Sequence, residues 1–349
     1  MLPPEKMILL FCELGKRLAA GRCLGFSLAF RDAISKSIQY NPWFTADSIS
    51  YALNAIIENL KYKKLEYWIS RYGNDLSKQG DGKVAVVMAG NIPLVGFHDF
   101  LSVLVSGNKF IGKCSSQDRF LLPAIAEELI SLEPEMKSFI EFGADRLRGF
   151  DAVIATGSDS TSQYFEYYFG KYPHIIRKNR NSVALLFGNE TDEQLSALAD
   201  DIFLYFGLGC RNVTKLYVCD GYNFDPLINA LKRYSNTLLN HTKYHNNYDY
   251  HKAILMINKI RYADTGFCLL KEDTSIASPI SVLHYEYYKN TNAILENIKL
   301  YSEKIQCIVA NEKYNGFTVN FGSCQKPELW DYADGVDTME FLINFNNAN

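Results

Sequence analysis

The sequence predicts an α/β protein with parallel, doubly wound sheets and a helical N-terminal segment. From Val84 onward, short and wholly apolar runs alternate with longer stretches whose apolar residues have helical spacing. An apolar run is typical of a strand buried on both faces of a parallel sheet. Its alternation with helices indicates βαβ units. Residues 1–80 are predicted to be helical instead.

The clearest element of the N-terminal segment is a helix predicted over residues 48–67. Its apolar residues recur at helical spacing, at Ile49, Leu53, Ile56, Ile57 and Leu60. The polar stretch 72–82 then predicts a linker to the first sheet.

Residues 81–180 are predicted to form a first α/β unit with a parallel, doubly wound sheet. Its strands are expected at residues 84–88, 109–113, 151–156 and 174–177. Its helices are expected at residues 93–107, 122–130 and 160–169. The first of these helices should begin at Pro93, because proline is favoured at the first helical position.

Residues 181–310 are predicted to form a second α/β unit. Strands are expected at 182–187 and 214–219, and a helix at 226–239. Between the two strands, Thr191 and Gln194 form a capping box that begins a helix ending at Gly207. The tail, 311–349, is expected to be strand-rich from Asn311, and either to serve in oligomerisation, as the resemblance described below implies, or to return to the first α/β unit.

Composition narrows the function classes. The 349 residues have a formal net charge of −3, which argues against the basic face that nucleic acids require. No apolar stretch approaches the roughly 18 residues of a membrane span. The N-terminal apolar run is short and flanked by acids, so it makes a poor secretory signal, and we expect a cytoplasmic protein.

Eight cysteines are present, and none forms a CxxC pair, so neither zinc nor a disulfide framework is expected. Most should be inert core residues. Cys210 differs, because its neighbours are Gly207, Gly209 and Arg211 rather than aliphatic residues. Its thiol is therefore a candidate nucleophile.

Asn91 follows the first predicted strand, in the stretch MAGNIPLVG. An amide at the carboxyl end of a parallel strand lies where open α/β sheets bind ligands. It can donate a hydrogen bond to a developing oxyanion. The alternative is that Asn91 only caps the following helix.

Two further strand ends are candidates for cofactor binding. Thr156, Gly157 and Ser158 form a turn between a strand and a helix, which suits a diphosphate or is an ordinary βα turn. Lys113 ends another strand and either contacts a nucleotide or is a surface lysine. His241, His245 and His251 lack the third ligand and the glutamate of a zinc-protease motif, so no metal is expected.

The order of these four segments resembles the aldehyde dehydrogenase superfamily over about residues 84–279. The stretch GCRNVTKLYV resembles the nucleophile segment of its acyl-CoA reductase branch, typified by the LuxC fatty-acyl reductases. The resemblance implies a catalytic Cys210 thiolate and an oxyanion-hole amide from Asn91. It also implies that residues 81–180 are a nucleotide-binding domain of the Rossmann type, with a cofactor site made by Lys113, Ser116, Thr156, Gly157 and Ser158, and that residues 181–310 are the catalytic domain.

Three departures from the family pattern shape the expected chemistry. Arg177 stands where oxidising relatives have the glutamate that activates water, so hydrolysis of an acyl-enzyme should be slow. The carboxylate that many relatives direct at the nicotinamide ribose is also missing, and Ser275 is the residue nearest to its position. Ser116 replaces a glutamate that holds the ribose 2′-hydroxyl, which favours NADPH and leaves NAD as the alternative cofactor.

The resemblance therefore implies NADPH-dependent reduction of an acyl thioester, on CoA or on an acyl-carrier protein, to an aldehyde. Two alternatives stay open: a catalytically degenerate acyl- or nucleotide-binding subunit of a larger complex, and a semialdehyde or acyl-phosphate reductase. A homodimer, or an acyl-activating partner enzyme, is the expected protein partner. Neither a nucleic-acid partner nor a membrane span is expected.

Overall fold

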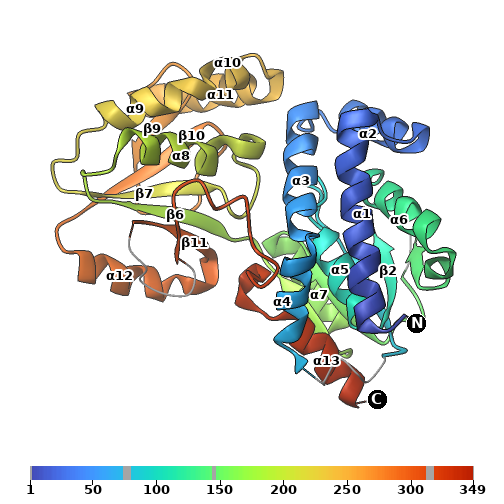
Figure 1. Cartoon of the computed structure of the whole chain (residues 1–349). Coiled ribbons are helices and arrows are strands. Elements are labelled where there is room, and N and C mark those ends of the chain that lie inside the picture. Colours follow the sequence, from blue (N-terminus) through green and yellow to red (C-terminus); the bar gives the residue numbers. More distant parts are fainter. Residues whose placement is uncertain (1, 74–79, 144–146, 312–317, 349) are drawn as a thin grey trace. The chain divides into compact units, whose positions relative to one another are not determined.

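The computed structural model describes residues 2–73, 80–143, 147–311 and 318–348. It confirms the predicted α/β class and the helical N-terminal segment (Figure 1). The chain forms two compact units. The first contains Met1–Lys178 and Pro327–Asn349, and the second contains Asn179–Lys326.

Four helices precede the first sheet: α1 (Pro4–Leu24), α2 (Leu28–Tyr40), α3 (Ala46–Asn59) and α4 (Tyr62–Ser70). The predicted single helix over 48–67 is therefore wrong, because two helices occupy that stretch. Lys61 adopts an extended conformation, which interrupts the helical path between them. A capping box formed by Thr45 and Ser48 begins α3, and its apolar stripe is buried.

The first unit contains a five-stranded sheet whose pairings are all parallel, in the order β3-β2-β1-β4-β5. Its strands are β1 (Lys83–Val87), β2 (Lys109–Lys113), β3 (Ile140–Phe142), β4 (Ala152–Thr156) and β5 (His174–Arg177). The chain builds outward from β1 in one direction and then from β4 in the other. This order creates a topological switch point between the carboxyl ends of β1 and β4.

Helices cover both faces of this sheet. α5 (Phe97–Val105) and α6 (Leu121–Leu132) share one hydrophobic core with the N-terminal helices. α7 (Asp159–Phe169) packs on the opposite face, where Phe165 and Phe169 contact Ala85, Val153 and Ala155. A short 3-10 helix, η2 (Pro134–Ser138), precedes β3.

The helix after β1 begins at Phe97, so the predicted start at Pro93 is wrong. Leu94 has a φ of 59°, in the left-handed region that an α-helix cannot include. Its N–H group donates to the Asp118 carboxylate at 2.7 Å instead of joining a helix. The four residues from Pro93 to Gly96 therefore lengthen the turn that contains Asn91.

The second unit contains a seven-stranded sheet in the order β12-β11-β6-β7-β10-β9-β8. Only the β8–β9 pairing is antiparallel among the described strands of this sheet. The strands are β6 (Asn181–Leu186), β7 (Val213–Cys219), β8 (Ala263–Asp264), β9 (Leu269–Glu272), β10 (Val282–Tyr288), β11 (Ile305–Val309) and β12 (Thr318–Val319).

Helices also flank the second sheet (Figure 1). The capping box of Thr191 and Gln194 begins α8, as predicted. Between β6 and β7 lie α8 (Asp192–Phe203) and η3 (Leu204–Gly207). Between β7 and β8 lie α9 (Asp225–Leu231), η4 (Lys232–Tyr234), α10 (Ser235–Leu239) and α11 (Thr242–Ile257). Between β10 and β11 lie α12 (Thr291–Leu300) and η5 (Ser302–Lys304).

The C-terminal tail differs from the prediction. It contains the short strand β12, but its last described elements are η6 (Ala333–Gly335) and the helix α13 (Thr338–Ala348). Met339, Leu342 and Ile343 follow helical spacing and join the core of the first unit. Much of the predicted strand stretch, residues 312–317, lies outside the described residues.

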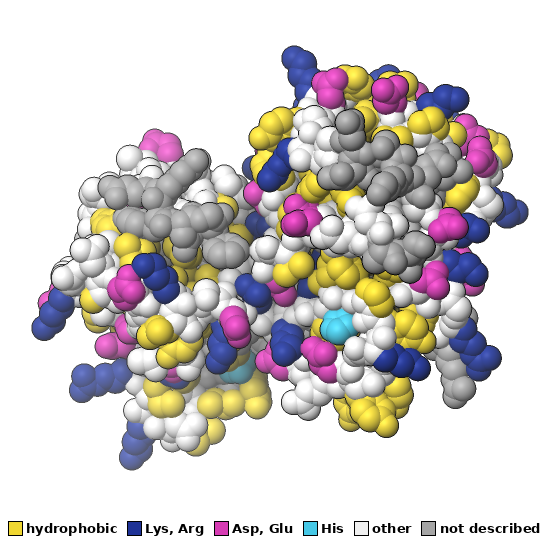
Figure 2. Space-filling view, turned by 90° about the horizontal axis from the view of Figure 1, so that it is seen from below, with side chains coloured by type: hydrophobic (Ala, Val, Ile, Leu, Met, Phe, Trp, Pro, Cys, Tyr) yellow, Lys and Arg dark blue, Asp and Glu magenta, His cyan; other side chains and the backbone are white. Residues whose placement is uncertain are grey.

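Lysine, arginine, aspartate and glutamate side chains are interspersed on the face shown in Figure 2, with hydrophobic side chains among them. Within the described ranges, no helix is both long enough and apolar enough to cross a bilayer.

Candidate active site

Cys210 is the exposed residue of a short loop, residues 208–212, at the amino end of β7 in the second unit. The chain enters this loop through Tyr205, Phe206 and Gly207, whose φ angles are 55°, 59° and 77°. Left-handed backbone costs energy for residues other than glycine, and such strain is often found at functional sites. The turn ends α8 abruptly and presents the thiol at the protein surface.

Asn212 fixes the loop from inside. Its side chain is completely buried, and its Oδ1 atom accepts the N–H of Gly209 at 2.8 Å. Its Nδ2 atom donates to the carbonyl oxygens of Asp201, Ile202 and Leu204. These carbonyls lie at the end of α8, where a helix leaves acceptors without internal partners. One amide therefore closes the helix and positions the cysteine loop.

Ser182 connects the loop to the sheet. Its hydroxyl donates to the carbonyl oxygen of Cys210 at 3.1 Å and accepts the N–H of Cys307 at 3.1 Å. The Arg211 guanidinium lies 3.2 Å from the sulfur of Cys307. The backbone around Cys210 is thus held by β6 and β11 as well as by α8.

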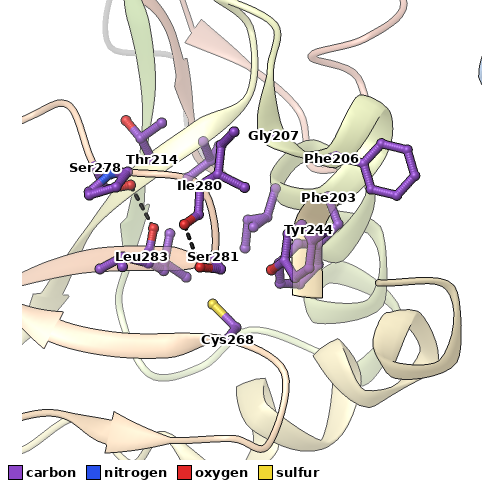
Figure 3. Close-up of a pocket in the computed structure, with 14 residues that line it drawn as sticks. Phe203, Phe206, Gly207, Thr214, Tyr244, Cys268, Ser278, Ile280, Ser281 and Leu283 are labelled. Atoms are coloured by element: carbon purple, nitrogen blue, oxygen red, sulfur yellow. Dashed lines mark hydrogen bonds between the residues drawn. The ribbon is translucent and has the colours of Figure 1, made fainter. Parts of the chain in front are cut away.

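A small cavity lies beside this loop within the second unit (Figure 3). Its lining includes the two residues that precede the loop, Phe206 and Gly207, and the two that follow it, Val213 and Thr214. Its remaining walls come from α8, α11, Cys268 and residues 278–283. The cavity volume is about 30 Å³.

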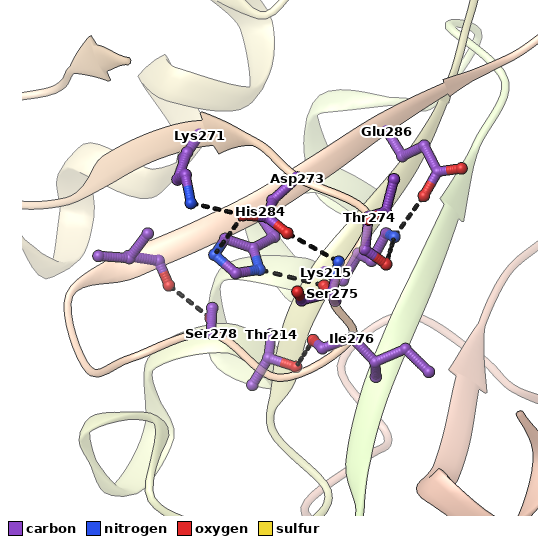
Figure 4. A network of polar contacts seen from close by, with 11 residues as sticks. Thr214, Lys215, Lys271, Asp273, Thr274, Ser275, Ile276, Ser278, His284 and Glu286 are labelled. Atoms are coloured by element: carbon purple, nitrogen blue, oxygen red, sulfur yellow. Dashed lines mark hydrogen bonds and ion pairs between the residues drawn. The ribbon is translucent and has the colours of Figure 1, made fainter. Parts of the chain in front are cut away.

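The loop before β10 approaches the same edge of the sheet and is fixed by a polar network (Figure 4). The buried Lys215 ammonium donates to the carbonyl oxygen of Thr274 at 2.7 Å and pairs with Glu286. The ring of His284 contacts the carbonyl oxygen of Ser275 at 3.1 Å. Lys215 is therefore a structural residue of β7.

Asp273 completes the network. Partial burial opposes its ionisation, but the Lys271 ammonium and the Ser275 N–H group lower the pKa of this carboxyl. Burial lowers the pKa of His284 and favours its neutral ring. Ser275 itself is exposed.

The other predicted site residues lie at the carboxyl edge of the first sheet. Val87, the last residue of β1, is paired with Lys113 of β2 and Ala155 of β4. Three neighbouring strands therefore end at the switch point, and each carries predicted site residues at or after its end: Asn91 after β1, Lys113 on β2, and residues 156–158 on and after β4. Gly96 is the N-cap of α5, so Asn91 is not the cap of that helix.

Asp118 and Asn41 hold the turn that contains Asn91. The buried Asp118 carboxylate accepts the N–H of Leu94, and the Asn41 amide donates to the carbonyl oxygens of Gly90 and Gln117. A Cβ atom on Gly90 would lie 2.7 Å from the side chain of Ser115. Only glycine lets the two turns pack this closely.

Burial raises the pKa of Asp118 to about 6, although the Leu94 N–H group opposes the rise. The folded protein therefore binds this proton more tightly than the unfolded chain. The protonated carboxyl thus contributes to the free energy of unfolding at low pH, and this contribution is lost as pH rises from about 4 to about 6. The difference from the ordinary pKa of 3.8 corresponds to at most about 3 kcal/mol. We expect Asp118→Asn to remove this loss, so that the variant gains stability relative to wild type across that pH window. Urea unfolding at a series of pH values measures the difference in free energy of unfolding between the variant and wild type. A constant difference between the two proteins would contradict the assignment.

The turn after β4 is compact. A Cβ atom on Gly157 would lie 2.8 Å from the ring of Phe165. The Ser158 hydroxyl caps α7 by accepting the N–H of Thr161 at 3.2 Å. Thr156 ends β4, and Ser116 is exposed after β2. Only glycine therefore lets the end of β4 pass this close to α7.

Arg177 is buried at the end of β5 and does not face solvent. Its guanidinium binds the Asp99 carboxylate of α5 through two contacts, at 2.6 and 2.9 Å. It also donates to the Thr338 hydroxyl of α13 at 2.9 Å. Arg177 therefore joins β5, α5 and the C-terminal helix as a structural residue.

The three histidines of α11 have other contacts. His241 is the N-cap of the helix, and its ring accepts the N–H of Tyr244. His245 contacts the Leu239 carbonyl oxygen at 3.0 Å. Burial lowers the pKa of His251. In the described part of the chain, no group of three or more His, Cys, Asp or Glu side chains could hold a metal ion.

Sequence reasoning missed Asn212, Asp118 and Asp99, which position the predicted site residues. The asparagine two residues after Cys210 was visible, but its helix-closing contacts depend on the path of α8. Cys210 belongs to the second unit and Asn91 to the first. Their predicted cooperation stays a prediction.

The chain has the fold of the aldehyde dehydrogenases. It superposes on aldehyde dehydrogenase 21 from Physcomitrella patens with a TM-score of 0.67 and 11% identity, over 99% of this chain and 85% of that chain. An NADP-dependent enzyme from E. coli gives a TM-score of 0.65 at 12% identity, over 88% and 73%. Residues 30–236 match the family model for acyl-CoA reductase (LuxC). The chain therefore belongs to the acyl-CoA reductase (LuxC) family, which confirms the resemblance inferred from its motifs.

Two curated relatives are long-chain acyl-protein thioester reductases. The protein from Photobacterium leiognathi is 24% identical over 207 residues, which are 54% of this chain and 43% of the relative. The protein from Aliivibrio fischeri is 24% identical over 202 residues, covering 54% and 41%. The matches thus span less than half the length of these relatives.

Proposed function

We propose that this protein reduces an acyl thioester to an aldehyde, with NADPH as the preferred cofactor, through an acyl group bound to Cys210. The observation that supports this most directly is the loop around Cys210. An exposed thiol is fixed on a strained turn by the buried Asn212 amide, in a chain of the acyl-CoA reductase family. A core cysteine would need neither the exposure nor the support.

In the proposed reaction, the Cys210 thiolate attacks the carbonyl carbon of the thioester on CoA or an acyl-carrier protein. The carbon–sulfur bond to the carrier breaks, the carrier thiol leaves, and a new thioester to Cys210 forms. The Asn91 amide and the N–H group of Cys210 would stabilise the oxyanion of this step. NADPH bound to the first unit would supply the hydride for reduction of the acyl carbon. The carbon–sulfur bond to Cys210 would then break, releasing the aldehyde and returning Cys210 as a thiolate.

The contacts of Arg177 support reduction rather than hydrolysis. Its guanidinium is committed to Asp99 and Thr338 and has no basic lone pair. It therefore cannot activate water as a carboxylate would. An acyl group on Cys210 would then persist until it is reduced.

The first unit fits a dinucleotide. Its strand order is that of nucleotide-binding folds, with the switch point between β1 and β4. Lys113 would contact the adenosine ribose, and the turn formed by Thr156, Gly157 and Ser158 would lie along the diphosphate. Asp159 in the first turn of α7 adds a negative charge, so backbone N–H groups would have to bind the phosphates.

Ser116→Glu should change the cofactor preference toward NADH. The carboxylate would repel the 2′-phosphate of NADPH and accept a hydrogen bond from the 2′-hydroxyl of NADH. We expect the ratio of kcat/KM for NADPH to that for NADH to fall by roughly 10- to 100-fold. Ser116→Gln, with a similar size and no charge, is the control and should change the ratio much less. An unchanged ratio in Ser116→Glu would mean that the 2′-position of the adenosine ribose does not lie beside Ser116.

The function is tested by following NADPH consumption and aldehyde formation with a panel of acyl-CoA thioesters and acyl phosphates. Aldehyde formation from the thioesters supports the proposal. Activity with acyl phosphates alone would identify an acyl-phosphate reductase. No consumption with any substrate, together with tight acyl-CoA or NADPH binding, would identify a binding subunit.

A further inference from the structure

A second pocket lies at the amino edge of the five-stranded sheet, within the first unit. Its volume is about 210 Å³, larger than the roughly 150 Å³ of a cavity that holds benzene. Lys83 and Lys109, the first residues of β1 and β2, line it together with residues 137–141, which end η2 and begin β3. The turns proposed to bind NADPH follow the carboxyl ends of β1, β2 and β4, so this pocket lies at the opposite edge of the sheet.

Three lysines give this pocket a positive charge. The ammonium groups of Lys83, Lys109 and Lys137 form no ion pair and no hydrogen bond in the described part of the chain. Glu141 is the one carboxylate among the residues that line the pocket. The neighbouring Asp151 carboxylate accepts the backbone N–H of Lys83 at 2.9 Å and lies outside the lining. The lining therefore carries three positive charges and one negative charge.

Two of the lysines are neighbours in the sheet. Lys83 and Lys109 are paired in the parallel register of β1 and β2, so their side chains leave the same face of strands about 4.8 Å apart. The Lys109 ammonium lies 5.9 Å from the centre of the Phe139 ring, which also lines the pocket. This contact places the ammonium at the pocket wall. Like charges on adjacent strands repel each other, and an anion bound between them would remove the repulsion.

We propose that this pocket binds compounds with a diphosphate group through the ammonium groups of Lys83, Lys109 and Lys137. A diphosphate carries several negative charges, which match the excess of positive charge in the lining, and lysine binds phosphate oxygens as a point charge. The Ser138 hydroxyl, also in the lining, can donate a further hydrogen bond. The site goes beyond the proposed reductase function and holds a second ligand, apart from NADPH.

Free diphosphate and nucleoside diphosphates share this group, and the apolar part of the wall separates them. Phe139 and Ile140 line the pocket and are only half-buried, so they offer a surface on which a base can pack. Free diphosphate makes no use of that surface. Tighter binding of ADP than of diphosphate would identify a nucleotide as the ligand, and the reverse order would identify free diphosphate.

The test is isothermal titration calorimetry of the whole chain with sodium diphosphate and, separately, with ADP. About 0.15 M salt screens weak long-range attraction. We expect wild type to bind diphosphate, and Lys137→Gln to raise the Kd roughly fivefold or more. The double variant Lys109→Gln/Lys137→Gln should raise it further. Binding should persist after saturation with NADPH, because the two sites lie at opposite edges of the sheet.

Lys171→Gln is the matched control in the same unit. Lys171 is exposed and its ammonium lies 5.2 Å from the centre of the Tyr172 ring, but neither residue lines the pocket. This variant should bind diphosphate as wild type does. Lys109→Gln removes one of two repelling charges, so without diphosphate it should unfold at the same urea concentration as wild type or a higher one.

Three results would overturn the inference. The first is the absence of binding to wild type at about 1 mM diphosphate. The second is equal weakening in Lys137→Gln and Lys171→Gln, which would show only a general effect of charge. The third is displacement of diphosphate by NADPH, which would place the anion at the cofactor site. A protein that binds diphosphate as expected but reduces no acyl thioester would overturn the proposed function alone.

Discussion

Cys210→Ala is expected to lose aldehyde formation almost completely, by roughly 10⁴-fold or more, because no other group can form the covalent intermediate. The substitution removes one exposed sulfur atom and leaves the Asn212 contacts to Gly209 and the α8 carbonyls in place. We therefore expect little change in stability. The effect should lie in kcat, with thioester and NADPH still bound.

The intermediate can be observed without turnover. Wild type incubated with radiolabelled acyl-CoA and no NADPH should retain label that neutral hydroxylamine releases, and peptide mapping should place it on Cys210. Cys23→Ala is the control, since Cys23 is another exposed cysteine, on α1 of the first unit. It should label and turn over as wild type does. Equal labelling of wild type and Cys210→Ala would show that another residue is the nucleophile.

The sequence predicted four of the five strands of the first sheet closely, because buried parallel strands are short apolar runs between turn residues, but it missed the three-residue edge strand β3 (Ile140–Phe142). Lys109–Lys113 and His174–Arg177 are strands at the predicted limits. The capping box at Thr191 was also predicted correctly, because it depends on two residues that are only three positions apart. The candidate Cys210 was also visible, because glycines and a charged neighbour are unusual around a core cysteine.

Long-range contacts decided the features that the sequence left undetermined. Leu94 is left-handed because its N–H group is bound by Asp118, 24 residues later, so Pro93 does not begin α5. The tail ends in a helix because its apolar stripe completes the core beside α5. Arg177 was identified as the residue in place of a catalytic glutamate, but its partner Asp99 lies 78 residues away.

Arg177→Met is the substitution with the largest expected effect on stability. It would leave the Asp99 carboxylate buried, with 8% of its side chain exposed, and without its charged partner. Loss of one member of a buried pair typically costs about 3–5 kcal/mol. The double variant Asp99→Leu/Arg177→Met should recover much of this loss, because no buried charge remains.

Urea unfolding followed by tryptophan fluorescence measures this loss in the appropriate unit. The three tryptophans, Trp43, Trp68 and Trp330, all belong to the first unit, as Arg177 does. Arg17→Met is the matched control. Arg17 pairs with Glu128 at 3.4 Å with 40% of its side chain exposed, and such a pair contributes at most about 1 kcal/mol. Equal losses in the two single variants would contradict a structural role for Arg177.

Arg177→Glu separates the structural role from the catalytic position that this residue occupies in oxidising relatives. If the side chain faced the acyl group, the new glutamate would activate water and the product would change from aldehyde to carboxylic acid. The contacts to Asp99 and Thr338 predict otherwise. Two buried carboxylates would face each other, so the variant should be less stable than Arg177→Met and should form no acid. Product analysis with an acyl-CoA and either NADPH or NADP decides between the structural role and a position at the acyl group. A well-folded Arg177→Glu protein that releases acid would require Arg177 to lie at the reacting carbonyl.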